Sequence, residues 1–130
     1  MAWENLPSTN TPLNATNLNQ FDVYSTSETV IGKWIDNKVI YRKVIDVGNL
    51  PNNTYKEVTH NISNLSYVTK LYLVVTTGTS FYQANMTGTD QMYSSGTVCI
   101  RALSDKIQIA TTSNYSSHSG YAIIEYTKTT

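Results

Sequence analysis

The stretch Thr29-Val-Ile-Gly-Lys-Trp-Ile-Asp-Asn-Lys-Val-Ile-Tyr-Arg-Lys-Val-Ile45 decides the fold class of this chain. Two runs rich in β-branched and aromatic residues flank an Asp-Asn pair at 36–37, and both of these residue types tolerate a positive φ. The pattern predicts a β-hairpin with a two-residue type I′ turn, in which Trp34 faces Val39. We therefore expect a protein built from antiparallel strands.

The two faces of this hairpin differ in composition. One face is apolar and is predicted to face the core, with the ring of Tyr41 lying over Gly32. Its members are Val30, Gly32, Trp34, Val39 and Tyr41. The other face alternates apolar residues with Lys33, Lys38 and Arg42, so it is either solvated or covered by another chain. In an assembly, the apolar members of this mixed face would form a subunit interface: Ile31, Ile35, Ile40 and Val44.

Short β patterns separated by turn residues fill the rest of the chain. Residues 47–54 are predicted to form a loop and 61–66 one helical turn. A second tight hairpin is expected around Ser104 and Asp105. The further predicted strands are 55–60, 67–77, a brief one at 81–84, 97–103, 106–112 and 121–128. Seven to eight strands without a long helix predict an all-β fold, an antiparallel β-sandwich or jelly roll.

Two of these segments carry a clear burial pattern. Ile107 and Ile109 alternate with polar residues, which is typical of a half-buried strand. The centre of the segment 67–77 is instead continuously apolar from Leu71 to Val75. A continuous apolar run predicts burial on both faces, so this strand should be central or lie at a subunit interface.

Residues 1–22 differ from the rest, because they hold two prolines and isolated large apolar side chains on a polar, turn-rich background. We expect an extended arm that docks onto another chain or a larger particle; the alternative is an arm folded back on its own domain. Residues 23–130 would then form the head domain. The residues expected to anchor the arm are Trp3, Leu6, Pro12, Leu13, Leu18 and Phe21.

The charge of the chain is low and balanced. Nine basic residues match nine acidic ones, and only 14% of residues are charged. A net charge of zero argues against a nucleic-acid or anionic-membrane partner, because both attract basic patches. The sequence holds no apolar run of the ~20 residues that span a bilayer and no signal-peptide pattern, so we expect synthesis in a cytosol without standard export. Polar but uncharged surfaces are typical of stable assemblies outside the cytosol.

The residues that usually carry chemistry form no recognisable set. Cys99 is the only cysteine, and its surroundings predict a small apolar strand residue. His60 and His118 are far apart, and neither neighbours paired acidic residues in the sequence. No glycine-rich phosphate loop is present. We therefore predict no enzyme activity, no cofactor and no metal site.

Tyrosine is over-represented, with ten tyrosines against two phenylalanines. Aromatic rings with a polar edge suit half-exposed contact surfaces, and flanking Asn, Ser and His side chains can bond sugar hydroxyls. Such a saccharide site would use Tyr82, Tyr93, Asn114, Tyr115 and His118. The alternative is that tyrosines serve as ordinary strand residues, as expected for Tyr41, Tyr72, Tyr121 and Tyr126.

Both ends of residues 23–130 resemble a module found at the C-termini of tail-fibre and baseplate-associated proteins of phages and prophages of Gram-positive and gut bacteria. That module typically reads Tyr-Ser-Thr, Gly-x-Trp-Ile-Asp-Gly-Lys, Tyr-Arg-Lys and Asn-Ile-Ser, and it closes on a Gly-Tyr strand with Ile-Glu-Tyr-Thr-Lys-Thr. The matching segments here are 24–45, Asn61-Ile-Ser and Gly120-Tyr-Ala-Ile-Ile-Glu-Tyr-Thr-Lys-Thr129. Asn37 stands where the module usually has glycine. Trp3-x-x-Leu-Pro and Thr11-Pro-Leu-Asn-Ala-Thr-Asn-Leu-Asn19 resemble the virion-attached start of phage appendage proteins.

The resemblance implies a bacteriophage virion structural protein, the head domain of a short fibre or tail appendage. Such a protein would be made in the bacterial host cytoplasm, form a homotrimer, attach to other virion proteins through residues 1–22 and contact host-surface saccharide. The alternative is a decoration or cementing protein of the capsid, neck or tail without a receptor-binding role. A glycan depolymerase is disfavoured, because no paired carboxylates stand in a recognisable setting.

Overall fold

The computed structural model describes residues 23–84 and 98–129, and these residues form eight β-strands and no helix. The predicted arm, with the anchor residues from Trp3 to Phe21, and the candidate ligand residue Tyr93 lie outside the described residues. The strands are β1 (Thr29–Lys33), β2 (Val39–Asn49), β3 (Tyr55–Thr59), β4 (Leu65–Thr76), β5 (Phe81–Ala84), β6 (Val98–Ala102), β7 (Lys106–Thr111) and β8 (Ser119–Lys128).

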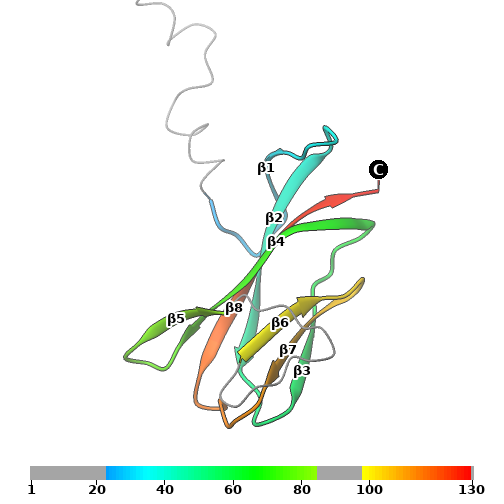
Figure 1. Cartoon of the computed structure of the whole chain (residues 1–130). Coiled ribbons are helices and arrows are strands. Elements are labelled where there is room, and N and C mark those ends of the chain that lie inside the picture. Colours follow the sequence, from blue (N-terminus) through cyan, green and yellow to red (C-terminus); the bar gives the residue numbers. More distant parts are fainter. Residues whose placement is uncertain (1–22, 85–97, 130) are drawn as a thin grey trace, which may run out of the picture.

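The strands form two antiparallel sheets, which confirms the predicted all-β sandwich. The larger sheet has the order β1-β2-β8-β4-β5, and the smaller one the order β3-β7-β6. Figure 1 shows the small sheet lying against the lower part of the large one, while the β1–β2 hairpin and the C-terminal end of β8 extend beyond it at the top. The large sheet is therefore covered on one side only by described strands.

The core lies between the two sheets. From the large sheet, Leu73 and Ile124 are fully buried, and from the small sheet Ile107 and Ile109 are at most 1% exposed. Lys106 beside them stays partly exposed, as the alternation predicted. The brief strand at 81–84 and the hairpin between β6 and β7 are confirmed as well.

The register of the first hairpin differs from the prediction by one residue. Trp34 N–H donates to the Lys38 carbonyl at 2.8 Å, so Lys33 rather than Trp34 faces Val39. The loop therefore has three residues, of which only Asn37 takes a positive φ, at 70°. A type I turn followed by one left-handed residue needs a single residue that tolerates positive φ, whereas type I′ needs two.

The faces of this hairpin also needed correction. A β-bulge between Val30 and Gly32 shifts the pairing again, so that Val30 faces Tyr41. Val30 is 52% exposed and not a core residue. The Tyr41 ring does not lie over Gly32, because no atom lies within 4 Å of a Cβ built there; it stacks on Tyr126 at 5.8 Å.

Two other predictions were wrong, and a third was correct only in part. The expected loop from residue 47 is the end of β2, where Val47 is 2% exposed and a bulge with Gly48 at φ 65° absorbs the glycine. The expected helical turn at 61–66 is absent, since Asn61 and Asn64 both take left-handed φ values and β4 begins at Leu65. The apolar run of β4 is buried on one face only, since Val74 is 37% exposed, but β4 does lie in the interior of the large sheet, as predicted.

One carboxylate helps to hold the segment before β1 on the large sheet, together with the hydrogen bond from Val44 N–H to the Ser25 carbonyl. Glu28 accepts hydrogen bonds from the Tyr126 hydroxyl and, at 2.8 Å, from Lys128 Nζ. Burial opposes the charged form of Glu28, but the bonds from Lys128 and Tyr126 and the positive charge of Lys128 outweigh it and lower the pKa of the carboxyl. Burial likewise raises the pKa of the Tyr126 hydroxyl, and the bond to Glu28 adds to this.

Replacing Glu28→Gln should make the protein less stable near neutral pH, and the difference from the wild type should become smaller in acid. The pKa of Glu28 is lower in the folded state than the unfolded value of about 4.3, so its contribution is present above that pH and is lost as the pH falls through the folded pKa. Urea unfolding of both proteins at about pH 7 and about pH 3 measures this. An equal difference at both pH values would contradict it.

Replacing Gly120→Ala should destabilise the protein by about 1–3 kcal/mol, because the added Cβ would overlap the backbone carbonyl oxygen of Val74 on β4. Gly32→Ala is the matched control, since its Cβ would meet no atom within 4 Å. Chemical denaturation of the two variants and the wild type provides the measurement. Equal stability of both variants would show that β8 does not need this close approach to β4.

Candidate functional site

Three of the predicted ligand residues meet at one end of the sandwich. The Tyr82 hydroxyl lies 3.0 Å from His118 Nδ1, and the two rings stand edge to face with centroids 5.9 Å apart. Tyr115 packs edge-on against the same imidazole at 5.0 Å. The sequence reasoning therefore grouped these residues correctly, although β5 and the loop before β8 are far apart in the chain.

This cluster closes the core rather than opening to solvent. Tyr82 and Tyr115 are half-buried and pack against the core residues. Burial raises the pKa of the Tyr82 hydroxyl, and Tyr115 adds a smaller effect. Asn114 is exposed, but its Oδ1 already accepts hydrogen bonds from the backbone and side chain of Ser116. The polar groups of this cluster are thus mostly engaged with one another.

A different surface of the described chain is open and rich in aromatic residues. We call it the outer face: the side of the large sheet turned away from the small sheet. Cross-strand pairing places Tyr121 of β8 beside Val74 of β4. It also places Phe81 of β5 beside Thr76, two residues further along β4. Phe81 is 80% exposed and Tyr121 48% exposed. An exposed group of large apolar side chains on one sheet face marks a contact surface.

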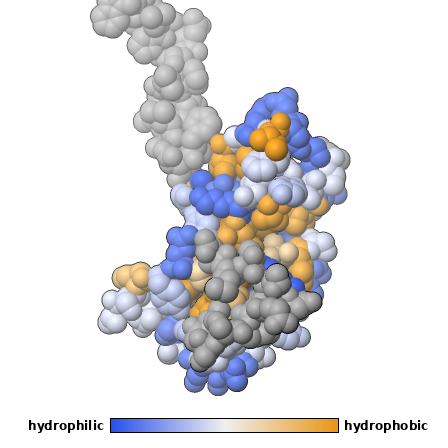
Figure 2. Space-filling view, in the orientation of Figure 1, coloured by the Kyte–Doolittle hydropathy of each residue, from blue (hydrophilic) through white to orange (hydrophobic). Residues whose placement is uncertain are grey.

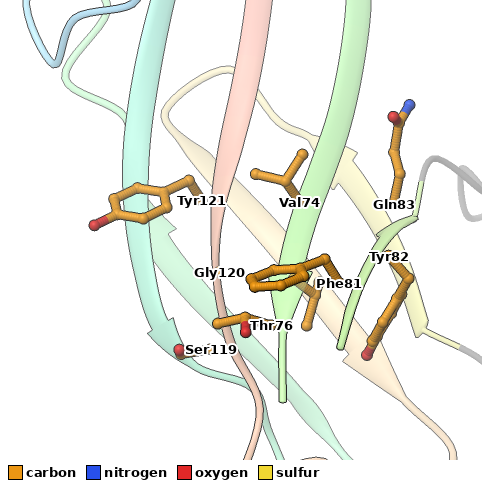
Figure 3. Close-up of a pocket in the computed structure, with 9 residues that line it drawn as sticks. Val74, Thr76, Phe81, Tyr82, Gln83, Ser119, Gly120 and Tyr121 are labelled. Carbon is orange, nitrogen blue, oxygen red and sulfur yellow. The ribbon is translucent and has the colours of Figure 1, made fainter. Parts of the chain in front are cut away.

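At the β8–β4–β5 end, the outer face is hollowed over a volume of about 480 Å³. Figure 3 shows the ring of Phe81 lying across β4 and Tyr121 pointing to the β2 side, with an open floor over β8 and β4 between them. We call this the outer-face hollow. The side chains that shape it are Val74, Thr76, Phe81, Gln83, Ser119 and Tyr121.

The hollow is neutral and keeps polar groups available. None of its lining residues is charged. Within residues 23–84 and 98–129, the side chains of Gln83, Ser119 and Tyr121 make no hydrogen bond, whereas Thr76 Oγ1 accepts one from Gly78 N–H at 2.9 Å. The nearest carboxylate by strand pairing is Asp46, which faces Tyr121 from β2 and accepts a hydrogen bond from Gly48 N–H.

The other end of the outer face is occupied by an ion pair. Arg42 and Glu125 approach to 3.1 Å, and each side chain is 13% exposed. The ring of Tyr24 covers the guanidinium at 4.1 Å. Burial, followed by a hydrogen bond with Tyr24, raises the pKa of Tyr72 next to this pair to about 12. This end is therefore a filled surface rather than a cavity.

The four residues predicted to form a subunit interface all lie in or beside the first hairpin. Ile40 and Val44 are half-buried on the outer face, and Ile31 is half-buried at the bulge. Ile35 sits at the hairpin tip and is 90% exposed. Figure 2 shows hydrophobic atoms at this tip surrounded by strongly hydrophilic ones.

The described residues offer little for metal or redox chemistry. Among them, no group of three or more His, Cys, Asp or Glu side chains is placed to hold a metal ion. His60 is 1% exposed; its Nε2 donates to the Leu103 carbonyl and its Nδ1 accepts from Ile62 N–H. Burial raises the pKa of the Cys99 thiol, which fits the strand role predicted for it. No helix in the described ranges is long and apolar enough to cross a membrane.

Sequence reasoning missed the outer-face hollow. Tyr121 was assigned to an ordinary strand position, and Phe81 received no role. The missing signal was the strand pairing that brings β5 and β8 to opposite sides of β4. One local clue existed: the continuous apolar run of β4 leaves Val74 on a face that no described strand covers.

Replacing Tyr82→Phe should destabilise the protein by about 1 kcal/mol, because the half-buried bond to His118 is lost. Tyr55→Phe is the matched control: Tyr55 is 56% exposed and its hydroxyl has no partner among the described residues, so the change should stay within about 0.5 kcal/mol. Urea unfolding of both variants measures the difference. A Tyr82→Phe protein as stable as the wild type would argue against a structural role for this cluster.

Comparisons with protein-family models, with curated protein sequences and with solved structures found no match to this chain. The site is therefore characterised by its own geometry: a closed aromatic cluster at one end of the sandwich, and an open, neutral, aromatic hollow on the outer face.

Proposed function

We propose that this chain is the head domain of a bacteriophage or prophage tail appendage, which associates with copies of itself and contacts the host cell surface. The observation that carries the proposal is the open outer face of the large sheet. Sheets in sandwiches usually alternate between a buried apolar side and a polar solvated side. Here the solvated side exposes Val74, Phe81 and Tyr121, so it has the composition of a contact surface.

The family resemblance supports the proposal through segments that are neighbours in the fold. Residues 24–45 and 120–129 carry the resemblance, and β2 pairs with β8 along most of its length. Glu28 adds hydrogen bonds to Tyr126 and Lys128. A sequence signature split between the two ends of the domain thus corresponds to one structural unit, made of β1, β2 and β8.

Self-association would use the hairpin end of the outer face. Ile40 and Val44 lie on this face, and Ile35 projects from the hairpin tip beside it. A trimer would cover these side chains and direct the hollows of its copies outward. Residues 1–22 would attach the assembly to the virion.

The purified 130-residue chain should form a trimer, with three times the 14.5 kDa chain mass, and should bind cells of its host. Ile40→Lys should shift dissociation of the trimer to at least about tenfold higher concentration, because it places a charge in the interface. Val30→Lys is the matched control, since Val30 is 52% exposed and lies on the opposite face of the same hairpin. Sedimentation at several concentrations measures the mass.

Two outcomes would contradict the proposal. A chain that stays monomeric at every concentration and binds no host cell, yet remains on washed phage particles, would favour a decoration protein. A trimer dissociated equally by Ile40→Lys and Val30→Lys would reject the hairpin end of the outer face as the interface.

A further inference from the structure

We propose that the outer-face hollow binds a neutral saccharide through Phe81 and Tyr121. This inference rests on the proposed host-attachment role and gives it a site and a ligand class. It also moves the predicted saccharide contact away from the cluster of Tyr82, Tyr115 and His118, where the Tyr82 hydroxyl is bonded to His118 and the Tyr115 ring packs on the imidazole.

Two aromatic side chains flank the hollow. Sugar rings present apolar C–H faces that stack on aromatic rings, and large exposed aromatic rings are otherwise unfavourable on a surface. Phe81 is one of only two phenylalanines in the chain, and it is 80% exposed. Figure 3 shows its ring lying across β4, with Tyr121 on the other side of the open floor. A sugar ring on that floor would contact one aromatic side chain at each edge.

Polar side chains also border the hollow. A saccharide needs both donors and acceptors for its hydroxyl groups, and Gln83 supplies both from one amide. Ser119 and the Tyr121 hydroxyl add two groups that can donate or accept. Within the described chain these three side chains have no other hydrogen-bond partner, so they are available without breaking an existing bond.

The absence of charge from the lining of the hollow selects the class of saccharide. No lining residue is charged, so the hollow offers nothing to neutralise an acidic sugar or a phosphate. Asp46 faces Tyr121 across the strand pairing and would repel a carboxylate or phosphate at this edge. A neutral sugar avoids this repulsion, and its hydroxyls can donate to the carboxylate. The hollow should therefore discriminate against uronic acids and phosphorylated polymers.

Two interior strands of the large sheet form the floor of the hollow. Val74 and Tyr121 stand on β4 and β8, which lie in the interior of the large sheet, so their positions are fixed before any ligand binds. A volume of about 480 Å³ lies in the range of small-ligand sites, and its open shape admits a stretch of polysaccharide. Open sites of this kind bind weakly. Several hollows on one assembly would raise the overall avidity by roughly 10²–10⁴.

The test is calorimetric titration of the 130-residue chain with four neutral probes: maltohexaose, cellohexaose, mannohexaose and chitohexaose. An oligogalacturonate of matched length serves as the acidic probe. At least one neutral probe should bind, and Phe81→Ala and Tyr121→Ala should each weaken it by at least about tenfold, through loss of ring stacking. Tyr55→Ala, which removes an exposed tyrosine from the small sheet, should leave binding unchanged. The acidic probe should bind more weakly than the neutral one.

Several results would overturn the inference. The wild type could bind no neutral probe, or it could prefer the acidic probe. The Phe81→Ala and Tyr121→Ala variants could also bind the neutral probe as tightly as the wild type does. A wild type that is trimeric and a Phe81→Ala variant that is monomeric at the same concentration would show that a second copy of the chain covers this hollow instead.

The same samples separate this inference from the proposed function. If the wild-type trimer binds host cells and the Phe81→Ala and Tyr121→Ala variants bind them equally well, the proposed function is supported and the hollow is rejected as the saccharide site. If the chain is a monomer and binds a neutral probe through Phe81, saccharide binding in the hollow is supported and the self-associating appendage head is rejected.

Discussion

The simultaneous pairing of β8 with β2 and β4 is the constraint on which the rest of the structure depends. β8 is the middle strand of the large sheet, and it can approach β4 because Gly120 carries no side chain against the Val74 carbonyl. Its register places Ala122 and Ile124 in the core and Tyr121 on the opposite face. A slip of one residue would exchange the two faces along the whole strand. Core and candidate site are therefore fixed by the same pairing.

The basic residues near this sheet are used largely inside the fold. Lys43 donates to the His60 carbonyl at 2.8 Å, and Lys56 to the Val47 carbonyl at 2.6 Å, so each amine satisfies a backbone carbonyl at a strand end. Arg42 is held by Glu125, and Lys128 by Glu28. These contacts take charge away from the surface of a chain that has little of it. The outer-face hollow itself has no charged lining residue.

Local patterns in the sequence were enough for the fold class, and non-local pairing was needed for the site. Alternation around Ile107 and Ile109 requires no knowledge of the partner strand, so these predictions were correct. The predicted register of the first hairpin was wrong by one residue, because its sequence fits a three-residue turn as well as a two-residue turn. The approach of Phe81 and Tyr121 depends on both strands pairing with β4, which no local pattern encodes.

The outer-face hollow also separates what the chain must keep from what it can change. Phe81, Gln83 and Tyr121 point away from the core, and exchanges at such exposed positions usually alter stability by less than about 0.5 kcal/mol. Gly120 and Ala122, which alternate with Tyr121 along β8, have no such freedom. Along β8, core-facing positions that the fold requires thus alternate with outward-facing positions that can be exchanged. Ligand preference can therefore change through substitutions in the hollow while the sandwich stays the same.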